Sequence, residues 1–167
     1  MLLSKDFLII ALCCLLLFST TLADDSLIKI KSPSLDQTLV PGKPINIEYI
    51  INAQKKNAPP PNYPSSMDVY FHWKGDSKEL EFKAVSGLVT QAIANGAESK
   101  TYRRTMKLPN CHFFKRYLPS EWSFTLVFQP NYPESIDLIG PKQANIVIPV
   151  RINTTATDDP HHNNRGC

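Results

Sequence analysis

The sequence predicts an all-β protein, an antiparallel β-sandwich of immunoglobulin-like or fibronectin III-like type with about seven strands. Two observations lead to this prediction. Apolar and polar residues alternate with a period of two in several short runs, which is typical of strands buried on one face only. Prolines and glycines separate these runs, and after the N-terminal segment no stretch shows the apolar period of an amphipathic helix.

The first two predicted strands lie on either side of a long turn. They cover residues 28–31 and 45–51, and each alternates isoleucines with polar or charged residues. The segment between them contains Pro33, Pro41 and Gly42, which favour turns. We expect the first strand to lie at a sheet edge, and the long turn to carry the chain across to a strand inside a sheet.

Residues 67–74 predict a third strand with a strongly apolar inner face. A turn at residues 75–78 leads into a short fourth strand at residues 79–83. The next segment, residues 86–99, fits either a strand or a short helical turn. Its periodicity does not choose between the two.

Three further strands follow towards the C-terminus. In residues 100–108, Arg104 falls among the inward-facing positions, which is acceptable only at a sheet edge. Residues 121–129 have a bulky apolar face, and residues 144–152 close the domain. Within this last strand, Pro149 indicates an edge position or a bulge.

The N-terminal segment, residues 1–23, predicts a signal peptide. A positive Lys5 precedes an apolar run too short to span a bilayer, and small residues favour cleavage after Ala23. We therefore expect a secreted protein with a single domain at residues 24–153. Residues 154–167 predict a flexible polar tail that lacks the hydrophobic end of a GPI signal.

Cleavage of the predicted signal peptide determines which cysteines remain in the mature protein. Cys13 and Cys14 leave with the signal peptide, whereas Cys111 and Cys167 enter an oxidising compartment. A disulfide between these two is one expectation; two unpaired thiols, or a bond from Cys167 to another molecule, are the alternatives. Asn153 begins an Asn-Thr-Thr sequon between the last strand and the tail, so we expect it to carry an N-glycan.

Known patterns for catalysis and metal binding are missing from the sequence. Of the four histidines only His161 and His162 are neighbours, and no His-x-Glu or Glu-x-x-His spacing accompanies any of them. His161 and His162 beside Asp158 and Asp159 could hold a metal loosely, but a flexible polar tail is the favoured interpretation. The Gly-x-Ser-x-Gly motif and the glycine-rich phosphate loop are also absent. We expect a protein that is not an enzyme and uses no metal or cofactor. The formal net charge of +3 gives no indication of a nucleic-acid partner.

A basic and aromatic segment, residues 99–120, is one candidate for ligand contact. It holds no acidic residue, and cations beside aromatic rings suit anionic or sugar-like ligands. The favoured alternative places the cations outward on a strand, with Phe113 and Phe114 closing the end of the sandwich. The candidate contact residues of this segment are Arg103, Lys115 and Arg116.

Three ring-bearing residues form a second candidate set. Tyr63, Tyr70 and His72 fit an exposed platform for a ligand. Packing between neighbouring strands accounts for them equally well.

The order of these features resembles a known family. An apolar-x-Ser-Pro start, a turn ending in glycine, an alternating strand ending in an aromatic residue and the stretch GLVTQAIANGAESKTYRRTMKLP are similar to one kind of domain. It is the immunoglobulin-like domain of fungal Ser/Thr-rich GPI-anchored cell-wall proteins and of related cell-wall glucan-synthesis proteins. The sequence departs from that family in having no Ser/Thr-rich stalk, and Glu121-Trp122 where the family has glycine and tyrosine. The resemblance implies a secreted fungal extracellular domain without an assigned chemistry.

Two functional classes remain. The first is a non-catalytic extracellular module, associated with the cell wall or surface, that binds a wall polysaccharide, a surface glycoprotein or another protein partner. The alternative is a small carrier that holds a lipid-like ligand between the sheets. A carrier needs a large cavity, whereas bulky rings in the predicted core favour the solid module. We expect both tryptophans to be mostly buried. The bulky core residues are Phe71, Trp73, Trp122, Phe124 and Phe128.

Overall fold

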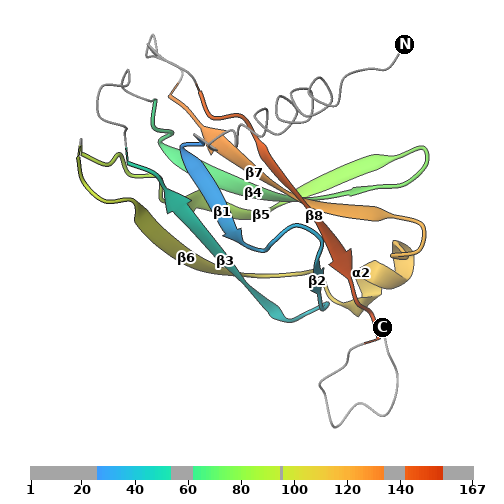
Figure 1. The fold of residues 1–167 in the computed structure, drawn as a ribbon. Coiled ribbons are helices and arrows are strands. Elements are labelled where there is room, and N and C mark those ends of the chain that lie inside the picture. Colours follow the sequence, from blue (N-terminus) through green and yellow to red (C-terminus); the bar gives the residue numbers. More distant parts are fainter. Residues whose placement is uncertain (1–25, 54–61, 95, 134–141, 156–167) are drawn as a thin grey trace, which may run out of the picture.

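The computed structural model consists of two β-sheets packed face to face, which confirms the predicted β-sandwich (Figure 1). The predicted signal peptide and all but two residues of the predicted tail lie outside the described residues. The structure describes residues 26–53, 62–94, 96–133 and 142–155.

The smaller sheet has three antiparallel strands in the order β1-β3-β6. They are β1 (Ile28–Ser32), β3 (Pro44–Ile51) and β6 (Lys100–Lys107). The central strand alternates strictly, because its inward side chains are buried and its outward ones are not. The buried side chains of β3 are Ile45, Ile47, Tyr49 and Ile51.

The larger sheet has five strands in the order β2-β8-β7-β4-β5. Only β2 and β8 pair in parallel, and the other neighbours are antiparallel. The described residues therefore form eight strands, against the seven or so that the sequence predicts. The strands of this sheet are β2 (Gln37–Leu39), β4 (Ser66–Lys74), β5 (Glu79–Leu88), β7 (Ser123–Asn131) and β8 (Ile146–Ile152).

The N-terminal strands cross between the two sheets. β1 lies at the edge of the smaller sheet, the chain then joins the larger sheet as β2, and it returns to the centre of the smaller sheet as β3. The predicted edge position of the first strand is confirmed, but the segment predicted as a crossing turn contains strand β2 and returns the chain to the same sheet, where β3 pairs with β1. Gly42 has a φ of 73°, a backbone conformation that glycine adopts without steric cost.

Arg104 and Pro149 are both unfavourable inside a β-sheet, and each lies at a position where a strand tolerates it. β6 is an edge strand, so Arg104 remains exposed although it falls on the inward side of the alternation. Pro149 lies in β8, which is second from the edge and not at it. Its carbonyl accepts a bond from the Asp36 N–H at 2.9 Å, and pairing with β2 begins only at Val150. Pro149 therefore comes just before the first residue of β8 that pairs with β2, a position where a strand tolerates the absence of the proline N–H.

A short helix closes one end of the sandwich, where the sequence indicated only a plug of apolar residues (Figure 1). It is α2 (Cys111–Arg116), and the Asn110 side chain caps it by accepting a bond from the His112 N–H at 3.1 Å. Phe114 is 1% exposed, and Phe113 lies 4.9 Å from Trp73 between ring centroids. The interpretation that these two phenylalanines close the sandwich is confirmed.

The two tryptophans differ in environment. Trp73 is 7% exposed, as predicted for a residue on the inner face of β4. Trp122 precedes β7 instead of lying within it, and it is only partly buried. Its ring lies 5.0 Å from the Tyr117 ring and packs against Gly75.

Gly75 leaves room for the Trp122 ring, and alanine there is expected to destabilise the fold. A Cβ at Gly75 would lie 3.1 Å from two atoms of the indole. Because the indole is rigid, we expect a loss of about 1 to 3 kcal/mol in the free energy of unfolding. Urea denaturation of Gly75→Ala measures this loss. The double variant Gly75→Ala/Trp122→Leu should recover part of it, and a single variant as stable as the wild type would contradict the prediction.

A buried carboxylate in β4 predicts a dependence of stability on pH. Asp68 is 7% exposed, accepts a bond from Lys83 Nζ at 2.6 Å and another from the Gly87 N–H at 2.9 Å. These bonds hold the pKa of Asp68 below its usual value, and the bond from Lys83 has the largest effect. A lowered folded-state pKa stabilises the fold above pH about 4, and this contribution is lost as the pH falls through the folded pKa.

We therefore expect Asp68→Asn to cost about 1 to 3 kcal/mol at neutral pH and progressively less below pH about 4. Chemical denaturation of both proteins across this range measures the difference. Glu81→Gln, at an exposed position of β5, is the control and should change little. A cost for Asp68→Asn that is the same at pH about 3 and pH about 7 would show that the charge is not responsible.

Candidate binding surface

The outer face of the smaller sheet carries a dense set of polar and charged side chains. Since alternate residues of β1, β3 and β6 are directed into the core, the intervening residues face solvent. Pairing brings residues far apart in sequence side by side on this face. Its principal polar and charged members are Lys29, Lys31, Asn46, Glu48, Thr101, Arg103, Thr105 and Lys107.

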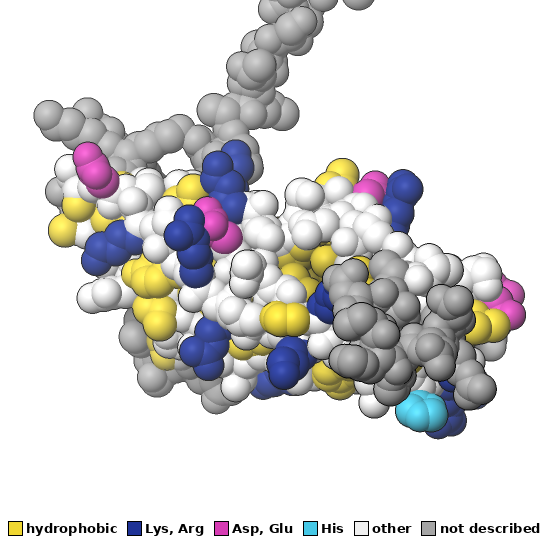
Figure 2. Space-filling model, turned by 90° about the horizontal axis from the view of Figure 1, so that it is seen from below, with side chains coloured by type: hydrophobic (Ala, Val, Ile, Leu, Met, Phe, Trp, Pro, Cys, Tyr) yellow, Lys and Arg dark blue, Asp and Glu magenta, His cyan; other side chains and the backbone are white. Residues whose placement is uncertain are grey.

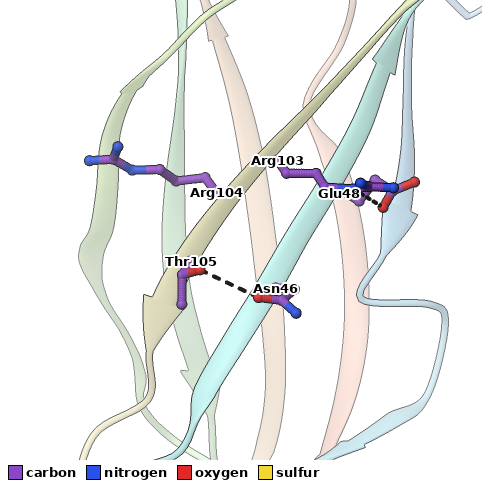
Figure 3. A pocket seen from close by; sticks show the side chains of 5 residues that line it. All are labelled: Asn46, Glu48, Arg103, Arg104 and Thr105. Carbon is purple, nitrogen blue, oxygen red and sulfur yellow. Dashed lines mark hydrogen bonds and ion pairs between the residues drawn. The ribbon is translucent and has the colours of Figure 1, made fainter.

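Two cross-strand pairs organise the centre of this face (Figure 3). Arg103 and Glu48 lie opposite each other, and Arg103 Nε donates to Glu48 Oε2 at 2.7 Å. The carboxylate raises the pKa of Arg103. One step along the same face, Thr105 Oγ1 donates to Asn46 Oδ1 at 3.4 Å. The β3–β6 ladder that holds these side chains pairs every residue of β3 from Pro44 to Ile51.

Two shallow hollows meet at Asn46. The first is drawn in Figure 3, in which Arg103 and Arg104 point to opposite sides of β6. The second follows the crossing segment from β1 through β2 to β3. Because both share Asn46, we treat them as one surface and call it the β3 groove. Its lining residues are Ser32, Gln37, Thr38, Leu39, Val40, Lys43, Pro44, Ile45, Asn46, Glu48, Arg103, Arg104 and Thr105.

The lining of the β3 groove has a distinct composition. Among the described residues that line it, most side chains are hydroxyls, amides or cations, Glu48 is the one carboxylate, and none is aromatic. The surface seen from below in Figure 2 likewise carries many Lys and Arg side chains and fewer acidic ones. The described part of the groove therefore offers hydrogen bonds and positive charge, and no ring for stacking.

The structure separates the basic residues that the sequence groups together. Arg103 lies in the β3 groove, whereas Lys115 and Arg116 lie on α2 and are not among its lining residues. The guanidinium carbon of Arg116 is 5.6 Å from the centre of the Tyr117 ring. The chain turns between β6 and α2 at Leu108–Asn110, so proximity in sequence does not place these cations on one surface.

The predicted platform of three rings is also divided. Tyr70 and His72 share the outer face of β4 in the larger sheet. Lys83 Nζ lies 5.4 Å from the Tyr70 ring centre, and His72 contacts Glu79 Oε1 through Nε2 at 2.8 Å. Tyr63 instead packs against the core, where its hydroxyl donates to the Asn52 carbonyl oxygen at 3.2 Å. These three residues do not form a common surface, and packing within and beside the sheet accounts for their positions.

The predicted glycan attachment residue follows the last strand. Asn153 comes directly after β8, and its N–H donates to the Leu39 carbonyl oxygen at 2.8 Å. Thr155, the third residue of the sequon, is exposed. We expect secreted protein to carry an N-glycan here, so endoglycosidase should increase its mobility on a gel. Asn153→Gln protein should run at that increased mobility without enzyme, and a wild type unaffected by the enzyme would contradict the prediction.

Cys111, the first residue of α2, is disulfide-bonded. Its partner is outside the described residues, as is Cys167, so the predicted pairing of these two cysteines stays a prediction. The described residues contain no cluster of three or more His, Cys, Asp or Glu side chains able to hold a metal ion. Within the described parts of the chain, the helices lack the length and apolar character needed to cross a membrane.

The sequence did not reveal most of the β3 groove. Alternation predicts only that Asn46, Glu48 and Thr105 face outward on their strands, and Gln37 falls within the predicted turn. The outward alternation was the available signal, but it does not say which strands are neighbours.

Neither the models of known protein families nor the curated proteins searched include a match to this chain.

Proposed function

We propose that this protein is a non-catalytic extracellular module that binds a surface polysaccharide, such as a cell-wall glycan, in the β3 groove. The observation that carries the proposal is the joining, at Asn46 on a continuous strand ladder, of a mainly polar hollow and a second hollow of mixed polar and apolar lining. Sugar hydroxyls both donate and accept hydrogen bonds, and the groove offers both kinds of partner in Asn46, Gln37 and Thr105.

An extended ligand suits this surface better than a small compact one. The hollows are shallow and lie one after the other across β3, from β6 towards β2. A fixed sheet that presents several polar groups loses little conformational entropy on binding. The predicted signal peptide and the resemblance to fungal cell-wall proteins support an extracellular polysaccharide as the ligand.

The lipid-carrier alternative has no comparable support. The rings of Phe71, Phe114 and Phe124 contact one another inside the sandwich, with centroid separations of 5.5 to 6.3 Å. Such packing leaves these rings in contact with protein and not with a ligand.

Co-sedimentation with insoluble glucan, chitin and whole cell walls tests the proposal. We expect the protein to bind at least one of these materials. The double variant Asn46→Ala/Thr105→Ala should bind it about tenfold more weakly, since two hydrogen-bonding groups are removed. The matched control is Thr125→Ala/Gln129→Ala, which removes the same two kinds of group from β7 in the other sheet. Equal binding by both double variants would exclude the β3 groove as the site.

A further inference from the structure

The lining of the β3 groove also indicates the chemical class of the ligand. Proteins commonly hold neutral sugars by placing an aromatic ring against the apolar face of the sugar, but the described residues that line the groove include no aromatic side chain. The aromatic residues of α2 that were candidates for this role are instead engaged with the core. Attraction in the groove must therefore come from hydrogen bonds and charge.

The charges in and beside the groove are predominantly positive. Arg103 and Arg104 line it, and Lys107 lies on the same face of β6 as Arg103, opposite Pro44. Lys31 is exposed on β1, beside the lining residue Ser32. Residues two apart on a strand are separated by about 6.6 Å, so Arg103 and Lys107 are about 13 Å apart along β6. Arg103 and Lys107 therefore lie in a row along β6, Lys31 lies beyond β3 on β1, and Arg104 points to the other side of β6. Positive charge is thus present at both edges of the smaller sheet.

Glu48 is the one carboxylate in the described part of the lining, and it is paired with Arg103. Its Oε2 accepts the bond from Arg103 Nε at 2.7 Å, which holds the guanidinium on the outer face of the sheet. A guanidinium has further N–H donors besides Nε, and their fork geometry matches a carboxylate. Arg103 is therefore held in place on a surface where another carboxylate can approach.

We infer that the ligand is an acidic polysaccharide, a polymer whose sugar units carry carboxylate groups. This inference rests on the proposed function and adds the charge of the ligand. Polar side chains contact the sugar hydroxyls, and the cations of β6 and β1 contact the carboxylates. A single-stranded nucleic acid fits less well, because its bases require aromatic side chains for stacking.

The decisive comparison uses the same sugar polymer with its carboxylates charged and with them neutralised. The probes are polygalacturonate oligomers and the same oligomers with every carboxylate methyl-esterified, titrated into the full secreted protein by isothermal calorimetry. We expect the acidic oligomer to bind at least about tenfold more tightly, since charge-assisted hydrogen bonds exceed neutral ones. Its affinity should fall as the salt rises from about 50 to about 200 mM.

Two variants of the central ion pair should act in opposite directions. Arg103→Gln should weaken binding of the acidic oligomer about tenfold, whereas Glu48→Gln should strengthen it by about threefold because it removes the opposing charge. The ion pair Lys74–Glu79 of the other sheet supplies matched controls, since it is exposed and has a separation of 3.4 Å. Lys74→Gln and Glu79→Gln should leave the affinity unchanged. Melting temperatures check that all four variants are folded.

Four results would overturn the inference. Equal affinity for both oligomers would mean that the groove takes a neutral glycan, and the proposed function would stand. Binding to cell walls without binding to either oligomer would reject the acidic polymer alone, whereas loss of all polysaccharide binding would reject both proposals. Equal affinity for polyphosphate of the same length would show that charge alone is recognised and that the ligand class is wrong.

Discussion

Replacement of Trp73 by alanine is expected to lower the free energy of unfolding by about 3 to 5 kcal/mol. The side chain is 7% exposed and contacts the rings of Phe71, Phe82, Phe113 and Tyr117. It therefore joins β4, β5 and the closing helix α2 in one aromatic cluster. Equilibrium unfolding in guanidinium chloride, followed by circular dichroism, measures the loss.

Two further variants show whether packing causes this loss. Among the described residues, Trp73 Nε1 has no hydrogen-bond partner, so Trp73→Phe should lose ring volume but no hydrogen bond and should cost less than the alanine variant. Leu35→Ala, at a side chain that is 68% exposed, should change the stability by no more than about 0.5 kcal/mol. A Trp73→Ala protein as stable as Leu35→Ala would contradict the account of the core.

Reduction of the disulfide at Cys111 is expected to destabilise the protein by about 2 to 4 kcal/mol, the usual range for such a bond. Cys111 begins the helix that places Phe114 in the core, so release of this position loosens the closed end of the sandwich. Thermal melts with and without reductant measure the change. Cys111→Ser should reproduce the lower melting temperature and make it insensitive to reductant. An unchanged melting temperature in both cases would contradict the prediction.

Peptide mapping under non-reducing conditions identifies the partner cysteine. Cys167 is the predicted one, and a free Cys167 thiol would show that this pairing is wrong. Deletion of residues 154–167 gives a second test of the same bond. If Cys167 is the partner, the deletion should lower the melting temperature of the oxidised protein and have little effect on the reduced protein.

The sequence predicts most of the sandwich because its central strands bury every second side chain. The predicted bulky residues of the inner faces of β4 and β7 are buried, namely Phe71, Trp73, Phe124 and Phe128. Short elements escaped prediction for a physical reason. β2 has three residues and α2 has six, fewer than a periodic pattern needs to be recognised. Trp122 was assigned to β7 because it continues that strand's alternation, although it packs outside the strand.

The candidate site was far less predictable than the fold. Arg103 was recognised as a candidate, but its partner Glu48 lies 55 positions away in the sequence, on a strand whose neighbour was unknown. Sheet pairing fixes which outward residues share a surface, and alternation alone fixes only the side of the strand. The same limit explains why Lys115, Arg116 and Arg103 were grouped, although the chain turns between them.

Nuclear magnetic resonance tests the central claim, that the β3 groove binds a polysaccharide, most directly. Isotope-labelled protein would be titrated with polygalacturonate oligomers and with soluble glucan fragments, and shifts in the backbone amide signals would be mapped onto the fold. We predict that at least one ligand shifts the signals of Asn46, Arg103 and Thr105. Shifts confined to Tyr70, His72 and their neighbours on the outer face of the larger sheet would contradict this claim.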